Sequence, residues 1–204
     1  RNAAQPVFIG GTVGCRGDAY TGEGALTDEE EAFGFHSWAT ERLAKAGADY
    51  LFASIMPTLP EAVGMARACS ATAVPYIISF TLRADGCLVD GTALAEAMRR
   101  IDGAADRPPL GYMVNCIHSC ILAEALAQPC NNASVIRERF LGIQANASRL
   151  TAEELDGAGA LYGSDPADLA RETAKLRRWF EPKVLGGCCG TDTDSVAAFA
   201  KLLR

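Results

Sequence analysis

The sequence lacks the features that mark nucleic-acid-binding and membrane proteins. Acidic residues outnumber basic ones by 25 to 19, and the formal net charge is −6, with no basic run to meet a phosphate backbone. The longest apolar runs, such as YIISF at 76–80, are far too short to cross a bilayer. We therefore expect neither nucleic acid nor a membrane among the partners of this protein.

Two kinds of motif are also missing. The opening RNAAQPVFIGG has neither the charged n-region nor the apolar h-region of a signal peptide, so we expect a cytoplasmic location. No G-x-G-x-x-G follows a strand and opens a helix, and no P-loop lysine is present. Nothing therefore points to a dinucleotide or nucleoside triphosphate as a ligand.

Eight cysteines stand out against this background. In a chain of this length without a secretory signature, we expect the cysteines to bind a metal or act in catalysis rather than to form disulfides. Cys188 and Cys189 are adjacent within GGCCGT, where the glycines allow a sharp turn that could aim both side chains at one site. The alternative is that both are buried core thiols. The cysteines that we expect to be free thiols without a metal role are Cys15, Cys69, Cys87, Cys120 and Cys130.

Short apolar strands alternate with helical segments along the whole chain. The expected strands are 6–14, 49–55, 75–82, 110–116, 140–146 and 183–187. The expected helices are 27–47, 59–70, 91–102, 118–127, 165–179 and 193–203. Thr27 and Glu30 form a capping box for the first helix, and Pro60 and Pro166 lie in the first turns of later ones. Strands apolar on both faces indicate a parallel sheet covered by helices, and hence an α/β fold.

Six such units could form a doubly wound sheet or most of an eight-unit barrel. Polar and glycine-rich residues follow nearly every strand, namely at 10–14, 79, 115–116, 146 and 186–189. A (β/α)8 barrel builds its active site along that rim, whereas a doubly wound sheet does so only at its switch point. We therefore predict a (β/α)8 TIM-barrel type of fold.

Three thiols stand at strand ends on this rim. Cys116 closes one strand, and Cys188 and Cys189 follow the last one, so the three could converge. Three thiolates form a soft ligand set that selects zinc, and three protein ligands leave one coordination position open, as in catalytic sites. Taken alone, Cys116 would be a core thiol.

These motifs resemble those of a known family. VNC at 114–116 together with GGCCGT at 186–191 is similar to the pair of zinc-binding motifs of the homocysteine S-methyltransferase family, which are zinc-dependent (β/α)8 enzymes. Further similar segments are GGTVG (10–14), LTDEEEAFGFHSWATERLAKAGADYL (26–51), PTLPEA (57–62), SFTLRADGCLVDGTALAEA (79–97) and DPADLARE (165–172). The resemblance runs from the third barrel strand to the eighth. It implies that the domain at 1–204 covers strands 3 to 8 only and lacks the two N-terminal β/α units of the family.

The resemblance implies a function. Cys116, Cys188 and Cys189 would bind zinc, and the thiol of homocysteine would take the open position as a thiolate. This thiolate would attack the activated methyl group of a donor such as S-methylmethionine, S-adenosylmethionine or betaine, and methionine would form. The alternatives are a catalytically impaired or substrate-altered relative that binds zinc and a thiol, and a methyl-transfer module that needs a partner domain or a corrinoid or folate protein. An oligomer is possible.

The resemblance also implies substrate contacts. In the family the strand at 49–55 ends with a glutamate that helps hold the substrate's amino group, and Ser54 occupies that position here. From their places on the rim, Ser79 and Asn146 could bind the amino-acid end of the substrate. Asn115 either would fix the loop that bears Cys116 or is a turn-forming asparagine. His118 is either a fourth ligand or base, or a solvated histidine at a helix N-terminus.

Overall fold

Six parallel strands form one curled sheet. The computed structural model describes residues 6–155, 159–160 and 162–202, so the ends of the predicted domain, 1–5 and 203–204, lie outside the described residues. The strand order in the sheet is the order along the chain, which confirms the predicted α/β barrel type of fold. The strands are β1 (Gly10–Gly14), β2 (Tyr50–Met56), β3 (Tyr76–Phe80), β4 (Gly111–Ile117), β5 (Phe140–Ala145) and β6 (Val184–Gly187).

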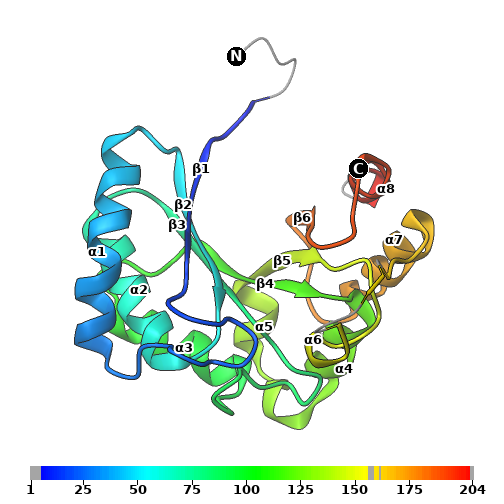
Figure 1. The fold of residues 1–204 in the computed structure, drawn as a ribbon, viewed down its shortest axis with the longest axis horizontal. Helices are drawn as coiled ribbons and strands as arrows, with labels where there is room; N and C mark the ends of the chain where they lie inside the picture. Colours follow the sequence, from blue (N-terminus) through cyan, green and yellow to red (C-terminus); the bar gives the residue numbers. More distant parts are fainter. Residues whose placement is uncertain (1–5, 156–158, 161, 203–204) are drawn as a thin grey trace.

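Helices cover the outer side of the sheet, which curls into a half-barrel (Figure 1). They are α1 (Glu29–Lys45), α2 (Leu59–Ala71), α3 (Leu94–Ala104), α4 (Ser119–Ala127), α5 (Ser134–Arg139), α6 (Ala152–Leu155), α7 (Pro166–Lys175) and α8 (Thr193–Leu202), with 3-10 turns η1 (Pro129–Asn131) and η2 (Leu176–Arg178). The sequence did not predict α5 and α6, because six and four residues are too few to show a helical period. None of the described helices is long and apolar enough to span a membrane.

The cap of α1 differs from the prediction by one residue. The helix begins after Asp28 and not after Thr27, because the Asp28 carboxylate accepts hydrogen bonds from the amides of Glu30 and Glu31, at 3.0 and 2.8 Å. A carboxylate at this position accepts two amides and also interacts favourably with the helix dipole, which a hydroxyl does less well. The predicted first-turn prolines of α2 and α7 are confirmed.

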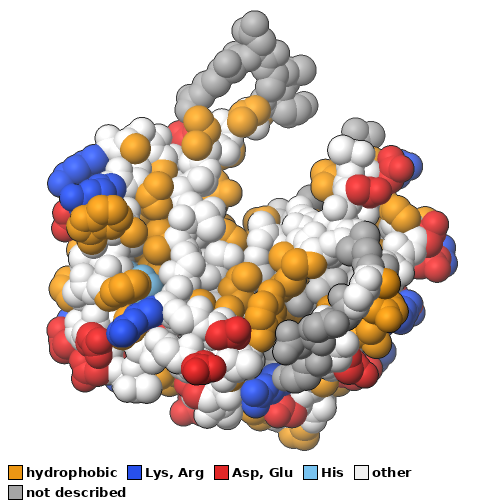
Figure 2. Space-filling model, in the orientation of Figure 1, with side chains coloured by type: hydrophobic (Ala, Val, Ile, Leu, Met, Phe, Trp, Pro, Cys, Tyr) orange, Lys and Arg blue, Asp and Glu red, His pale blue; other side chains and the backbone are white. Residues whose placement is uncertain are grey.

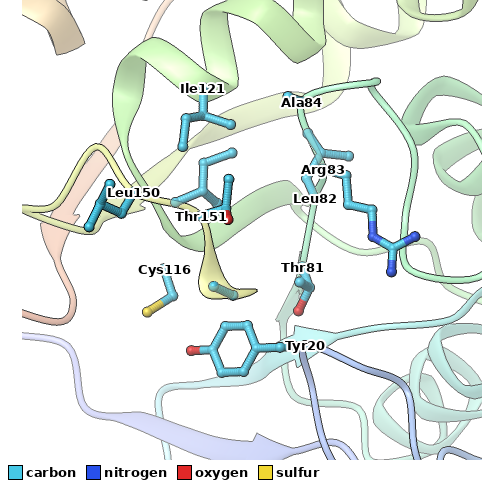
Figure 3. A pocket seen from close by; sticks show the side chains of 11 residues that line it. Tyr20, Thr81, Leu82, Arg83, Ala84, Cys116, Ile121, Leu150 and Thr151 are labelled. Atoms are coloured by element: carbon cyan, nitrogen blue, oxygen red, sulfur yellow. The ribbon is translucent and has the colours of Figure 1, made fainter. Parts of the chain in front are cut away.

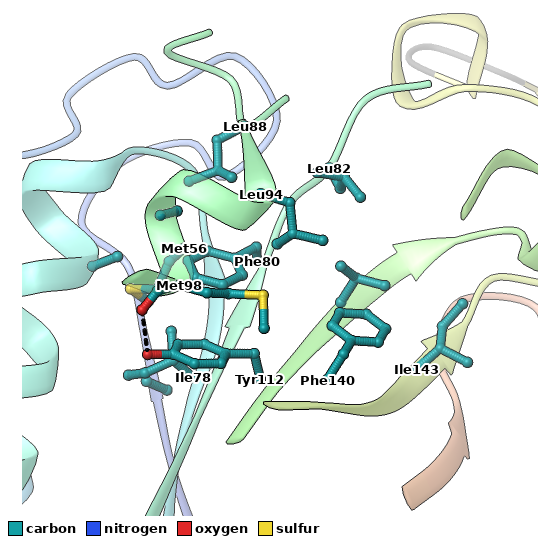
Figure 4. Close-up of a cluster of buried hydrophobic side chains, with 14 of the residues drawn as sticks. Met56, Ile78, Phe80, Leu82, Leu88, Leu94, Met98, Tyr112, Phe140 and Ile143 are labelled. Carbon is teal, nitrogen blue, oxygen red and sulfur yellow. Dashed lines mark hydrogen bonds between the residues drawn. The ribbon is translucent and has the colours of Figure 1, made fainter. Parts of the chain in front are cut away.

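The core is densest between the central strands and the helices behind them. All five residues of β3 are buried, and the rings of Phe80 and Tyr112 stack with their centroids 5.9 Å apart. The Tyr112 hydroxyl lies 3.0 Å from the Met98 carbonyl (Figure 4) and 2.7 Å from the Asp102 carboxylate, so this large side chain is buried with its polar atom satisfied. Strands β3 and β4 therefore give a rigid base to the rim above them.

The strands at the two ends of the described sheet each have one neighbour. Among the described residues β1 pairs only with β2, and β6 pairs only with β5. In Figure 2 hydrophobic side chains gather near the centre of the face, between these two ends, and charged ones lie mainly toward the periphery. The carboxyl ends of β4 and β6, which bear the cysteine motifs, are separated in the sheet only by β5.

Candidate metal centre

The structure brings together the three thiols that the sequence singled out. The sulfur atoms of Cys116, Cys188 and Cys189 all lie within 4.8 Å of one another. The Cys116 and Cys189 sulfurs are 3.2 Å apart, and those of Cys188 and Cys189 are 3.9 Å apart. Within the described part of the chain, no other group of three or more His, Cys, Asp or Glu side chains is placed to share a metal ion.

Cys116 reaches this cluster through an irregularity in β4. Its φ angle is +57°, in the left-handed region that residues other than glycine rarely adopt, and the register with β5 shifts between Asn115 and Ile117. In a regular strand successive side chains point to opposite faces, so the irregularity re-aims Cys116 at the point where the strand ends. Such a backbone conformation costs on the order of 1–3 kcal/mol, and strain of this kind concentrates at functional sites.

A tight turn after β6 brings the other two thiols to the same side. The Cys188 amide donates to the Ala145 carbonyl at 2.7 Å, and the Cys189 carbonyl accepts from the Ala147 amide at 3.0 Å, so the adjacent cysteines continue along β5. The chain then turns at Gly190, whose φ is +73°. A side chain at Gly187 would collide with that of Thr191, so glycine is required there for close approach and not for an unusual φ.

The cluster favours a single thiolate that accepts hydrogen bonds from the neighbouring thiols and from a phenol. Hydrogen bonds from Cys188, and then from Tyr20 and Cys189, lower the pKa of Cys116 to about 5, although burial opposes them. The hydrogen bond to Cys116 and burial raise the pKa values of Cys188 and Cys189. These opposite shifts favour Cys116 as the thiol that ionises first in the metal-free protein.

The donor set fits zinc. In a tetrahedral site with zinc–sulfur bonds of about 2.3 Å, the sulfurs lie about 3.8 Å apart. The sulfur separations of 3.2 and 3.9 Å bracket that value. Three soft thiolates, one from the end of β4 and two from the turn after β6, leave room for a fourth donor, and Cys189 is exposed to solvent.

A first prediction follows from the thiolate on Cys116. In metal-free protein we expect iodoacetamide to alkylate Cys116 before the other cysteines, with a rate that hardly changes between about pH 6 and 8, because a thiol with a pKa of about 5 is already ionised there. An ordinary thiol would react about tenfold faster per pH unit over that range. Peptide mapping by mass spectrometry measures the rates. A tenfold rise per pH unit at Cys116 would contradict the charge distribution described here.

The predicted substrate residues lie at different distances from the thiols. Asn146 is buried, and its side-chain nitrogen lies 3.8 Å from the Cys116 sulfur. Ser79 donates a hydrogen bond to the Asn115 side chain, whose amide in turn donates to Gln144, so these three side chains link β3, β4 and β5. Ser54 lies at the rim end of β2, opposite Gly14 and two strands from β4. The contacts of these residues with substrate stay predictions.

His118 differs from the expected solvated histidine. Its side chain is fully buried, and its Nδ1 atom accepts from the Cys120 amide at 3.2 Å as the N-cap of α4. Burial, and next the nearby Arg149, lowers its pKa. The predicted position of His118 at the helix N-terminus is confirmed. The prediction that its side chain is exposed to solvent was wrong, because the residues that cover it are distant in the chain.

A cavity of about 230 Å³ adjoins Cys116 (Figure 3). Its walls are mostly apolar, and they are formed by Leu82, Ala84, Ile117, Ile121, Leu150 and Ala152. Tyr20 and Thr81 also line it. The sequence reasoning missed both, although each follows a strand: Tyr20 lies in the glycine-rich loop after β1, and Thr81 directly follows β3.

A half-barrel with three thiols at its rim and a cavity beside them defines a class of protein, the barrels that carry a cluster of cysteines at the strand ends. A family model described as homocysteine S-methyltransferase matches residues 1–203. The chain belongs to the homocysteine S-methyltransferase family.

Individual relatives agree with this assignment. "Homocysteine S-methyltransferase YbgG" of Bacillus subtilis (strain 168) is 28% identical over 199 residues, which cover 92% of this chain and 58% of that protein. The solved apo form of the homocysteine methyltransferase MmuM from Escherichia coli has a TM-score of 0.68 at 23% identity, over 96% of this chain and 63% of MmuM. Its metallated form gives a TM-score of 0.70 at the same identity, over 61% of MmuM. At this identity the likeness shows the fold, and the chain spans less than two thirds of these relatives.

Proposed function

We propose that this chain carries the metal and thiol site of a zinc-dependent S-methyltransferase, which moves a methyl group from an activated donor to homocysteine and gives methionine. The observation that carries the proposal is the cluster of Cys116, Cys188 and Cys189 beside a cavity at the barrel rim. Family membership supports the reaction, and the metallated form of the E. coli relative supports a metal. The donor would be of the S-methylmethionine, S-adenosylmethionine or betaine type.

The chemistry requires a sulfur that stays nucleophilic at neutral pH. Zinc bound by the three cysteines would supply a fourth position at which a substrate thiol loses its proton. Three thiolates also bring the charge of the zinc site to −1, which leaves electron density on the incoming sulfur. The chain's own part is to hold Cys116 in the strained conformation that completes the set and to shield the cavity side with apolar walls.

The cavity suits a ligand of amino-acid size. At about 230 Å³ it falls below the range of about 300–1,000 Å³ that is typical of sites for drug-sized ligands. Its apolar walls would contact the methylene groups of homocysteine. Thr81 is buried, with 8% of its surface exposed. Its hydroxyl has no hydrogen-bond partner among the described residues. A buried hydroxyl without a partner is costly, so a polar group of the ligand is the natural partner.

Calorimetry tests the proposed substrate. We expect zinc-loaded protein to bind homocysteine with release of about one proton, because the thiol must become a thiolate, and to bind homoserine far more weakly. The binding heat should then vary with the ionisation enthalpy of the buffer. Incubation with homocysteine and each donor type, followed by detection of methionine, identifies the donor. Equal binding of homoserine, or a heat independent of buffer, would contradict the assignment.

Thr81→Val separates ligand binding from stability. We expect homocysteine affinity to fall about 5- to 12-fold, which corresponds to the 1–1.5 kcal/mol of one hydrogen bond. Thermal stability should not fall, because the hydroxyl has no partner to lose and valine has nearly the same shape. Titration calorimetry and a melting curve provide the two measurements. A variant that melts lower but binds normally would assign Thr81 to the fold alone.

A further inference from the structure

The loop between β1 and α1, residues 15–28, crosses the rim and brings Tyr20 to the metal centre. Tyr20 is half-buried, and its hydroxyl points toward the Cys116 sulfur across the mouth of the cavity (Figure 3). The two residues line the same cavity, and the neighbouring phenol helps to lower the pKa of Cys116. Of the side chains lining this cavity, Tyr20 is the one contributed by the β1 side of the sheet.

The loop holds Tyr20 in a defined orientation. The Asp18 carboxylate accepts from the amides of Tyr20 and Thr21, at 2.7 and 2.8 Å. The Asp18 amide donates to the Glu23 carbonyl at 2.9 Å, and its carbonyl accepts from Gly22 at 3.0 Å, so the tip closes on itself. Because hydrogen bonds fix the backbone on both sides of Tyr20, the direction of its ring is set by the loop.

A single buried carboxylate ties the two ends of this loop together. Glu61, in the first turn of α2, is fully buried. Its Oε1 atom accepts from the Arg16 amide at 2.6 Å, and its Oε2 atom accepts from the Leu26 amide at 3.0 Å. His36 of α1, also buried, places its Nε2 atom 3.0 Å from Oε1. Glu61 thus fixes the loop to the two helices behind it, and through the loop it fixes Tyr20.

We propose that Tyr20 donates a hydrogen bond to the Cys116 thiolate of the metal centre, and that Glu61 is a positioning residue that holds Tyr20 there. This inference rests on the proposed metal centre. A hydrogen bond to a metal-bound thiolate withdraws electron density from that sulfur and fixes its direction. The Glu61 carboxylate is suited to the positioning role because it has two oxygens, one for each end of the loop. An apolar residue at this place would leave the Arg16 and Leu26 amides and the His36 ring without this partner.

Cobalt substitution tests the proposal without an activity assay. Cobalt(II) bound by thiolates gives a sulfur-to-metal charge-transfer band in the near ultraviolet. We expect Tyr20→Phe to move this band to longer wavelength, because a thiolate that has lost a hydrogen bond is the stronger electron donor, and to weaken zinc binding about tenfold. Glu61→Gln, which cannot accept from both amides, should move the band in the same direction by a smaller amount. The double variant should show the shift of Tyr20→Phe alone, because Glu61 acts through Tyr20.

Thr40→Val is the matched control. Thr40 is buried on α1, and its hydroxyl bonds to the carbonyls of His36, Ser37 and Ala68, at 3.1, 3.1 and 3.5 Å. These partners lie in α1 and α2 and not in the loop, so this variant tests general loosening of the two helices. The band should stay at the parent position. A band that Tyr20→Phe leaves in place would overturn the proposal, and this outcome can be observed even if Glu61→Gln does not fold. Additive shifts in the double variant would overturn it as well. A parent protein without any thiolate band would overturn the metal centre itself and this inference with it.

Discussion

Replacing Cys116, Cys188 or Cys189 by serine is expected to lower zinc affinity by about 100-fold or more in each case. Structural zinc sites bind with about 10–16 kcal/mol, so the loss of one of a few ligands removes about 3 kcal/mol or more. A serine hydroxyl does not compensate, because it is a hard donor that stays protonated near neutral pH. Competition against a chromophoric chelator measures the affinity, and elemental analysis gives the stoichiometry, which we expect to be one zinc per chain.

Cys15→Ser and Cys130→Ser are the controls for this series. Both thiols are free, and neither belongs to the cluster of three. Their zinc affinity should equal that of the parent. Full zinc retention in any one of the three cluster variants would show that the metal binds elsewhere, and zinc loss in the controls would show that the effect is not specific to the rim.

Gly142→Ala is expected to weaken zinc binding although it changes no ligand. Gly142 pairs with Val184 in the β5–β6 ladder, and a β-carbon at this glycine would collide with the Val184 carbonyl oxygen. Because the collision is with backbone, β6 must move away, and Cys188 follows directly after that strand. We expect a loss of about 1–3 kcal/mol in the free energy of unfolding, as for other overpacked sites, together with a lower zinc affinity.

Gly103→Ala provides a matched control for this prediction. Gly103 lies in α3, and nothing stands within 4 Å of the β-carbon that alanine would add. The same substitution there should stabilise the protein by about 0.5–1 kcal/mol, because alanine is the better helix former, and zinc affinity should not change. Chemical denaturation and chelator competition give both quantities. Normal zinc binding by a destabilised Gly142→Ala protein would show that the β6 loop keeps its position without a regular ladder.

The sequence allowed prediction of the features that depend on local pattern. The alternation of apolar strands and helices gave the six-unit sheet, and the glycine frame of Cys188 and Cys189 indicated the turn that the structure places at Gly190. The position of Cys116 at a strand end was also visible, whereas its left-handed φ angle was not, because cysteine has no preference for that region.

What could not be predicted depends on contacts between distant segments. Glu61 reads as an ordinary acidic residue in a helical first turn, and only the folded chain brings Arg16, Leu26 and His36 to it. Thr81 is likewise unremarkable until its hydroxyl is found buried without a partner. The cap of α1 was misplaced for a local reason, because Thr27 and Asp28 are both good caps and the choice between them depends on which side chain reaches the free amides.

The position of Cys188 and Cys189 beyond an edge strand has a further consequence. Strand β6 has four residues, partners only β5 among the described strands, and is followed by α8. Short strands with few partners open at free energies below the global stability of a domain. A metal that joins Cys116 to the turn after β6 would act as a reversible cross-link across β5, so opening and metal release become one event. Zinc supply would then set the resistance of this end of the sheet to proteolysis as well as its chemistry.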